Sequence, residues 1–189
     1  MTKDTSKKVE YKIKATALEA FNLMKKDFHY KNKLQAPRLS KITISVATGR
    51  AMKQDKKKNE FVIGRLAKIA GQRPVETEAK KAIATYKTRI GDKIGVMVTL
   101  RGPRMYAFLQ KLLDASIPRT KDFRGLNKTS VDEMGNMTFG IKEHTIFPEI
   151  RDEELKDIFG MAITLTTTAK TKEEAVKFFE IIGIPFKKD

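Results

Sequence analysis

The side chains that most often perform catalysis are scarce in this sequence. It contains 2 histidines, His29 and His144, and no cysteine. The histidines do not stand at the spacing of a zinc site, so we expect each to be a surface or interface residue. The acids at residues 152–154 could attract Mg²⁺, but adjacent acidic side chains point in different directions and usually form a solvated surface. Since no glycine pattern of a nucleotide-binding loop occurs either, the sequence predicts no enzymatic activity, no metal site and no cofactor.

Cationic side chains, in contrast, are abundant. The chain holds 39 Lys and Arg against 23 Asp and Glu, which gives a formal net charge of +16. Residues 1–100 carry almost all of this excess, whereas basic and acidic side chains nearly balance in residues 101–189. A solubilising role for lysine is the alternative, but the size and the uneven distribution of the charge favour a localised surface that binds a polyanion, with nucleic acid as the first candidate.

Length and composition indicate one folded domain. A chain of 189 residues can bury a substantial core but is short for two complete domains, so we expect a single domain over residues 1–189. Its apolar runs are too short to span a membrane, and residues 1–14 lack the apolar stretch of a signal peptide. The absence of cysteine fits a reducing compartment. These features predict a cytoplasmic protein.

Amphipathic patterns predict helices near residues 16–28, 53–70, 103–117 and 171–182. Two of them begin with capping boxes, at Thr16 with Glu19 and at Thr171 with Glu174. Gly71 would end the second helix, whose start is rich in lysine. Because lysine at a helix start opposes the helix dipole, these charges favour a role in binding a partner, and a solvated lysine run is the alternative interpretation.

Alternating patterns predict strands near residues 42–46, 94–100, 137–141 and 163–167. In the first, Ile42, Ile44 and Val46 would face a core while Lys and hydroxyl side chains face outward. Residues 74–100 favour extended structure, with a turn at residues 91–93. The middle of this region has little to bury, so we expect a projecting basic loop around residues 76–92 that is mobile when the protein is alone.

Aromatic residues are too few to form a stacking platform for single-stranded bases. There are 4 tyrosines and no tryptophan, and neither the RNP1 pattern nor a G-x-x-G loop of the KH type is present. Binding is therefore expected to depend on contacts to the backbone and shape of structured RNA.

Several segments match a known family in order and spacing. They are residues 99–106 (TLRGPRMY), 118–119 (PR), 122–126 (DFRGL), 135–136 (GN), 140–143 (GIKE), 146–150 (IFPEI), 167–171 (TTAKT) and 173–175 (EEA). From about Phe28 onward, the sequence resembles the bacterial-type L5 family of large-subunit ribosomal proteins, which binds 5S rRNA.

The resemblance implies a two-layer α+β fold, an antiparallel sheet with helices packed on one face and RNA bound on the other. It also implies a structural role in the central protuberance, on cytoplasmic ribosomes. The implied partners are 5S rRNA, adjacent large-subunit rRNA, P-site tRNA, a protein of the small-subunit head and other proteins of the central protuberance. Outside the ribosome the family implies a monomer that does not bind membranes.

The resemblance also implies roles for individual positions. The implied 5S rRNA contacts are Ser45, Lys53, Lys56, Lys57, Lys58, Gln72, Thr99 and Arg101. The implied tRNA contacts in the basic loop are Lys80, Lys81, Lys87 and Arg89, and the implied intersubunit contacts are Arg124 and Lys142. One segment departs from the family, because residues 44–49 read ISVATG where L-N-M-G-V-G is usual. Ser45 offers one hydroxyl in place of the two-ended amide of asparagine.

Two other functions are compatible with the composition. A free RNA chaperone or regulator, acting away from the ribosome, would bind single strands broadly by stacking. A peripheral membrane protein would use its Lys-rich half to bind anionic lipid, although the apolar stripes of the predicted helices suit a protein core better.

Overall fold

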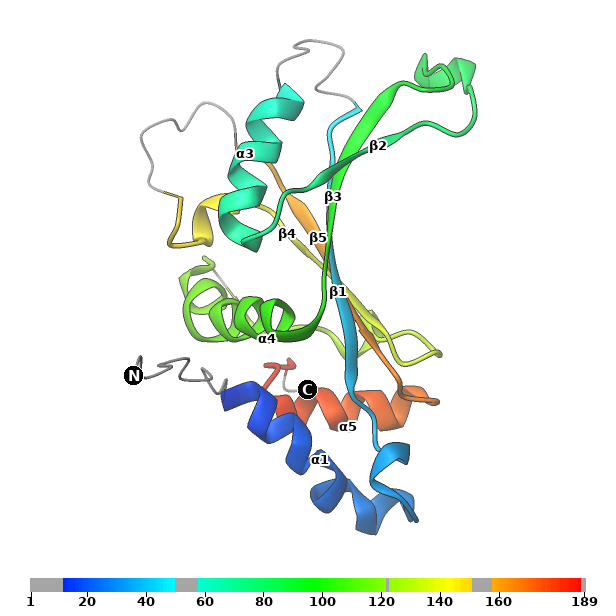
Figure 1. Ribbon diagram of the computed structural model, residues 1–189, viewed down its shortest axis with the longest axis vertical. Helices are drawn as coiled ribbons and strands as arrows, with labels where there is room; N and C mark the ends of the chain where they lie inside the picture. Colours follow the sequence, from blue (N-terminus) through cyan, green and yellow to red (C-terminus); the bar gives the residue numbers. More distant parts are fainter. Residues whose placement is uncertain (1–11, 50–57, 122, 151–157, 188–189) are drawn as a thin grey trace, which may run out of the picture.

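The computed structural model describes residues 12–49, 58–121, 123–150 and 158–187 (Figure 1). Within them lies a five-stranded sheet in the order β2-β3-β1-β5-β4, and each neighbouring pair is antiparallel. The strands are β1 (Leu39–Ala47), β2 (Val75–Glu78), β3 (Lys93–Leu100), β4 (Met137–Ile141) and β5 (Met161–Thr167). The α-helices are α1 (Lys12–Phe28), α3 (Lys58–Ala70), α4 (Gly102–Lys111) and α5 (Lys172–Ile182). The predicted α+β fold is confirmed.

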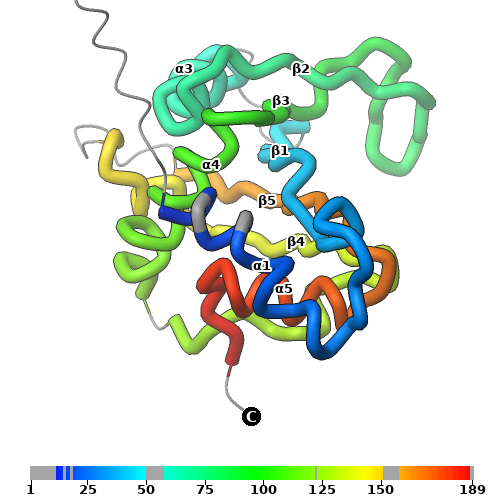
Figure 2. The backbone as a smooth tube through the Cα atoms, turned by 60° about the horizontal axis from the view of Figure 1, so that its bottom comes forward, coloured from blue at the N-terminus to red at the C-terminus, as the bar shows by residue number. Residues whose placement is uncertain are grey.

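The sheet has one buried and one open side. In β1, Ile42, Ile44 and Val46 are buried at 0 to 3% exposure, and the residues between them are partly or fully exposed. The same alternation continues through β5 and β4. Helices α3 and α4 cover the buried side, while α1 and α5 pack together at the end of the sheet farthest from the β2–β3 loop (Figures 1 and 2).

Helix α5 begins and ends as its sequence predicts. The Thr171 hydroxyl accepts a hydrogen bond from the Glu174 backbone N–H at 3.3 Å, and Gly183 adopts a φ of +94° just after the last turn. The carboxylate of Glu174 accepts from the Lys170 N–H at 2.7 Å and also from the Tyr30 hydroxyl. This second bond ties the segment after α1 to the start of α5.

The predicted start of the first helix is wrong. Helix α1 already begins at Lys12, so Thr16 lies inside the helix and is not its N-cap. Its hydroxyl donates to the Lys12 carbonyl at 3.1 Å, four residues back, as threonine can do within a helix. The capping-box spacing was present in the sequence, but the helical backbone extends beyond it.

Lys111 of α4 bonds to the last turn of α3. Lys111 Nζ donates to the Ile69 carbonyl at 2.6 Å and to the Glu149 carboxylate at 2.6 Å. The first bond satisfies a carbonyl in the last turn of α3, which has no partner within the helix. Gly71 follows with a φ of +64°, so the predicted glycine end of this helix is confirmed.

The expectation of two surface histidines holds for His29 only. His29 is exposed, whereas His144 is buried at 3% exposure. Its ring stacks on Phe159 with centroids 4.0 Å apart, and its Nδ1 accepts from the Phe159 N–H at 3.3 Å. Burial is tolerated because the ring combines an apolar stack with a hydrogen-bonded nitrogen.

Gly135 provides a test of the packing between β4 and α5. It has a φ of +76°, and a Cβ there would lie 2.8 Å from the Ala169 Cβ. Gly183 has a φ of +94° but nothing within 4 Å of such a Cβ. We predict that Gly183→Ala costs about 1–2 kcal/mol of backbone strain. Gly135→Ala should lower the free energy of unfolding by about 1–3 kcal/mol more than Gly183→Ala does, because its Cβ would also overlap Ala169. Urea unfolding of the two variants measures this, and equal losses would contradict it.

Candidate nucleic-acid interface

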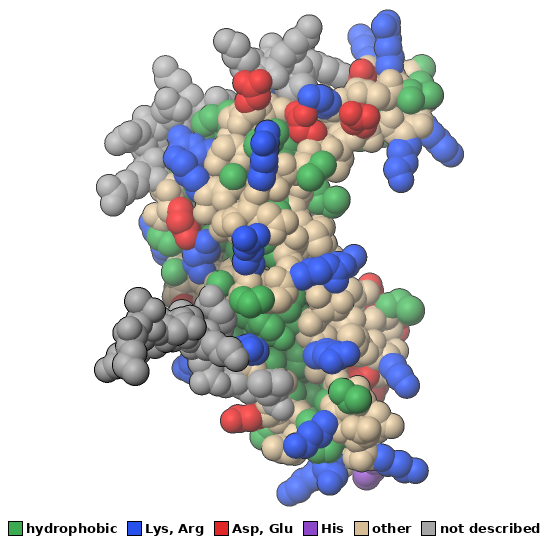
Figure 3. All heavy atoms as spheres, viewed as in Figure 1, with side chains coloured by type: hydrophobic (Ala, Val, Ile, Leu, Met, Phe, Trp, Pro, Cys, Tyr) green, Lys and Arg blue, Asp and Glu red, His purple; other side chains and the backbone are tan. Residues whose placement is uncertain are grey.

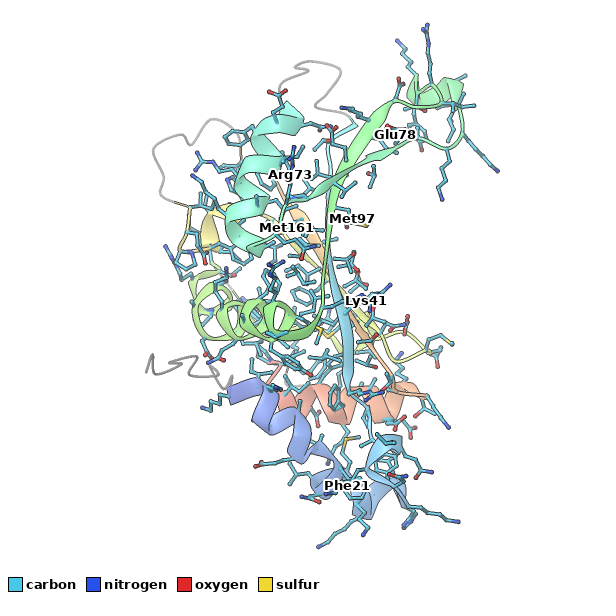
Figure 4. All side chains as sticks on the ribbon, in the orientation of Figure 1. Phe21, Lys41, Arg73, Glu78, Met97 and Met161 are labelled. Carbon is cyan, nitrogen blue, oxygen red and sulfur yellow. The ribbon has the colours of Figure 1, made fainter. Side chains whose placement is uncertain are left out.

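The side of the sheet that the helices leave uncovered is built from every second residue of each strand. We call it the open face: residues 41, 43, 45 and 47 of β1, 75 and 77 of β2, 95, 97 and 99 of β3, 138 and 140 of β4, and 162, 164 and 166 of β5. Lys41 and Met97 point away from α3 and α4 on this side (Figure 4). Among these positions Lys41 is the one charged residue, so the strands place no carboxylate on the open face.

The structure brings Ser45 and Thr99 together on the open face. Ser45 lies opposite Met97 in β3 and Ala162 in β5, and Thr99 lies opposite Thr43 in β1. They therefore occupy neighbouring cross-strand rows. Ser45 is exposed and Thr99 is half-buried, so both can be reached by a partner.

Gln72 lies beside the same strand but has a bond within the protein. Its Nε2 donates to the Thr99 carbonyl at 3.1 Å, and its Oε1 accepts from Arg104 Nη1 at 3.5 Å. Strand β2 begins only at Val75, opposite Met97, and does not reach Thr99. The amide of Gln72 therefore donates to the Thr99 carbonyl in place of a strand neighbour. The predicted contact residue thus also fixes the turn after α3 against the sheet.

Arg101 stands where β3 passes into α4. It is exposed, it occupies the N-cap position of α4, and its Nη1 donates to the Ser40 carbonyl at 3.4 Å. Ser40 precedes Lys41, so two cations border one end of the open face. Sequence reasoning placed Lys41 on the exposed side of its strand but did not select it as a contact. Its position next to Arg101 depends on strand pairing.

The predicted lysine cluster is only partly described. Lys53, Lys56 and Lys57 lie outside the described residues. Lys58 is the first residue of α3 in the described chain and is half-buried. Of this cluster the structure describes Lys58 alone, which lies at the end of α3 remote from Gln72.

The loop between β2 and β3 extends beyond the body of the protein (Figures 1 and 2). Its four predicted cations, Lys80, Lys81, Lys87 and Arg89, are all exposed. Basic side chains surround its tip in the space-filling view (Figure 3). The structure thus separates these residues from Ser45 and Thr99 on the open face.

The loop has internal structure. Ala79 and Asp92 close its base, since the Ala79 N–H donates to the Asp92 carbonyl at 2.8 Å. Near the tip, Ile83 and Thr88 pair around a short 3-10 turn, Ala84–Tyr86. Beside the base, Lys93 pairs with Glu76 at 2.5 Å. Hydrogen bonds from Lys93 and then Asn59 lower the pKa of Glu76, and the same ion pair raises the pKa of Lys93.

Apolar side chains at the loop tip were missed in the sequence. Ile83, Tyr86 and Ile90 are exposed at 46, 67 and 74%. The inner side of the loop and the ends of β1 and β3 enclose a hollow of about 820 Å³, lined by Ala47, Ile94, Tyr86 and the loop lysines among others. The signal was present, because three large apolar residues in a region with no core are candidates for contact.

The two predicted intersubunit residues are exposed but stand on different elements. Arg124 precedes Gly125 and Leu126, and Leu126 pairs with Phe186 near the C-terminus. Lys142 follows the end of β4. No contact described for the protein joins them, so the structure does not unite them in one cluster.

Metal clusters and membrane-spanning helices are both absent from the described part of the chain. It contains no cluster of three or more His, Cys, Asp or Glu side chains able to hold a metal ion. None of the helices described there is long and apolar enough to cross a membrane.

Comparison with known proteins gives a consistent result. Residues 32–89 match the family model for ribosomal protein L5, and residues 93–186 match the model for the C-terminus of the same ribosomal protein family. The large ribosomal subunit protein uL5 of Desulforamulus reducens is 48% identical over 167 residues, which cover 88% of this chain and 91% of that protein. The protein of the same name from Thermosipho melanesiensis is 48% identical over 170 residues, covering 90% and 93%. That from Ureaplasma urealyticum is 46% identical over 165 residues, covering 87% and 89%.

These matches decide between the classes of function that the composition left open. The family consists of structural ribosomal proteins, which confirms that the chain is not an enzyme. The first matched segment includes β1, β2 and the tip of the projecting loop, and the second includes β3, β4 and β5. With this coverage and with relatives nearly half identical to it, the chain belongs to the ribosomal protein L5 family.

Proposed function

We propose that this chain is a structural component of the large ribosomal subunit, where it binds 5S rRNA and adjacent rRNA of the central protuberance through the open face of its sheet. Family membership supports an RNA-binding ribosomal role on cytoplasmic ribosomes over a free RNA chaperone or a membrane protein. The observation that carries the choice of surface is the composition of the open face. Ser45 and Thr99 lie there on adjacent rows, Lys41 and Arg101 border it, and its strands carry no carboxylate that would repel phosphate.

The projecting loop serves a second RNA, the P-site tRNA, in this proposal. Long basic side chains on an exposed loop can hold phosphates without reading sequence, which suits an RNA that arrives and leaves. The loop is closed at its base by the hydrogen bond from Ala79 to Asp92, so it can meet this RNA without disturbing the sheet. Whether the loop is mobile in the free protein stays a prediction.

Protein partners complete the proposed assembly. Arg124 and Lys142 are proposed to face the small-subunit head, from two separate elements, and other proteins of the central protuberance are proposed neighbours. Outside the ribosome we expect a monomer, since the family role requires the open face to be free for RNA.

The first functional prediction concerns salt. The affinity of the purified protein for 5S rRNA should fall steeply as salt rises, because Lys and Arg displace counterions condensed on the RNA. Each phosphate contact should steepen the log–log slope by about 0.7 to 0.9. Filter binding across a range of KCl concentrations measures this slope, and a flat profile would contradict the electrostatic part of the proposal.

The second prediction separates the two surfaces. Replacing Ser45 with Ala and Thr99 with Val should weaken 5S rRNA binding by about 1–3 kcal/mol, because polar groups of the RNA lose their partners. Replacing all four loop cations, Lys80, Lys81, Lys87 and Arg89, with Ala should leave 5S rRNA binding nearly unchanged. The loop variant should instead weaken retention of P-site tRNA on reconstituted ribosomes.

The two variants serve as matched controls for each other. Urea unfolding of both should show that neither has lost its fold. The assignment of surfaces is wrong if the loop variant loses 5S rRNA affinity while the Ser45/Thr99 variant keeps it.

A further inference from the structure

Four threonines that are far apart in the sequence form one row across the open face. Thr43 of β1 lies opposite Thr99 of β3 on one side and Thr164 of β5 on the other, and Thr164 lies opposite Thr138 of β4. Neighbouring strands are about 4.8 Å apart, so the four hydroxyl-bearing side chains span about 14 Å at right angles to the strands. Thr138 is exposed and the other three are half-buried, so the row lies at the surface.

The hydroxyls of this row are available to a partner. Those of Thr138 and Thr164 lie 3.0 Å apart and share one hydrogen bond, which leaves one hydroxyl hydrogen and further lone pairs of this pair unused. Within the described chain, neither the Thr43 nor the Thr99 hydroxyl has a hydrogen-bond partner. The row thus offers both donors and acceptors without carrying a charge.

Beside the row, toward β4, the side chains are small. The adjacent row contains Met97, Ser45, Ala162 and Gly140; Met97 is exposed, and a Cβ placed on Gly140 would have nothing within 4 Å. On the other side of the threonines, Lys41 lies opposite Thr166 and near Arg101. The open face therefore combines a line of neutral hydroxyls with cations along one border.

We propose that this threonine row hydrogen-bonds to ribose 2′-hydroxyls in the minor groove of an RNA double helix. The inference rests on the proposed function, since it takes the open face as the RNA-binding surface, and it names the groups that the face reads. The minor groove of A-form RNA is wide and shallow and displays the 2′-hydroxyls, each of which can donate and accept. A row of threonine hydroxyls matches such groups chemically, while Lys41 and Arg101 reach the flanking phosphates. The row thereby selects RNA over DNA without reading base sequence.

Threonine also favours strands through its branched Cβ, and this alone would explain four threonines in a sheet. Valine has the same shape and branching but lacks the hydroxyl, so it separates the two explanations. The test variant is Thr43→Val with Thr164→Val. Thr43→Ser with Thr164→Ser retains both hydroxyls, and Thr129→Val changes a threonine on the surface turn Lys128–Ser130, away from the sheet.

The experiment is 2′-deoxy interference mapping on 5S rRNA. Pools of 5S rRNA with sparse 2′-deoxynucleotides are bound to each protein, and the positions at which deoxy substitution weakens binding are identified. The wild type, the serine variant and Thr129→Val should share a small set of sensitive positions within helical RNA. In the valine variant some of these positions should become insensitive, and affinity should fall by about tenfold, as expected for the loss of two hydrogen bonds.

The outcomes distinguish this inference from the function on which it rests. If the wild type does not bind 5S rRNA, the proposed function fails and this inference with it. If the wild type binds but the valine variant shows the same sensitive positions with unchanged affinity, the inference alone is overturned. It is also overturned if the valine variant binds more weakly with an unchanged set of sensitive positions, because the hydroxyls then do not contact ribose.

Discussion

The structure depends on the pairing of β1 with two antiparallel neighbours. Ile42, Ile44 and Val46 face the core, and a slip of one residue would turn all three to the open face. Burial of this one side therefore fixes the register of β1 against both β3 and β5. The same constraint places Thr43 and Ser45 on the opposite side, so the energetics of the core decide which hydroxyls a partner can reach.

The helical layer supports this arrangement by joining distant segments at their ends. Lys111 donates a hydrogen bond to a carbonyl in the last turn of α3. Gln72 donates one to the Thr99 carbonyl, which lies just beyond the start of β2. Both bonds satisfy backbone groups that regular structure leaves without partners. They also hold the turn after α3 beside the end of the open face. Gln72 can thus position the turn beside the open face even though its own amide is engaged within the protein.

The projecting loop is held by hydrogen bonds at its base and not by packing in the core. Its base is closed by backbone hydrogen bonds and flanked by the Lys93–Glu76 pair, while its tip exposes cations together with Ile83, Tyr86 and Ile90. Because few of its side chains enter the core, the loop contributes little to the packing of the sheet. Changes at the tip are therefore expected to leave the open face unaltered.

Local patterns in the sequence were sufficient for the strands, for the caps of α5, for Gly71 and for the basic loop, because these features depend on neighbouring residues and on the alternation of apolar side chains. The motifs also indicated the family, and with it Ser45, Gln72 and Thr99. Two features depend on the folded chain: the extension of α1 to residues before Thr16, and the burial of His144. A local sequence pattern gives neither the length of a helix nor a stacking partner 15 residues away. The row of Thr43, Thr99, Thr138 and Thr164 likewise exists only in the tertiary structure, because strand order and register bring residues from four separate segments side by side.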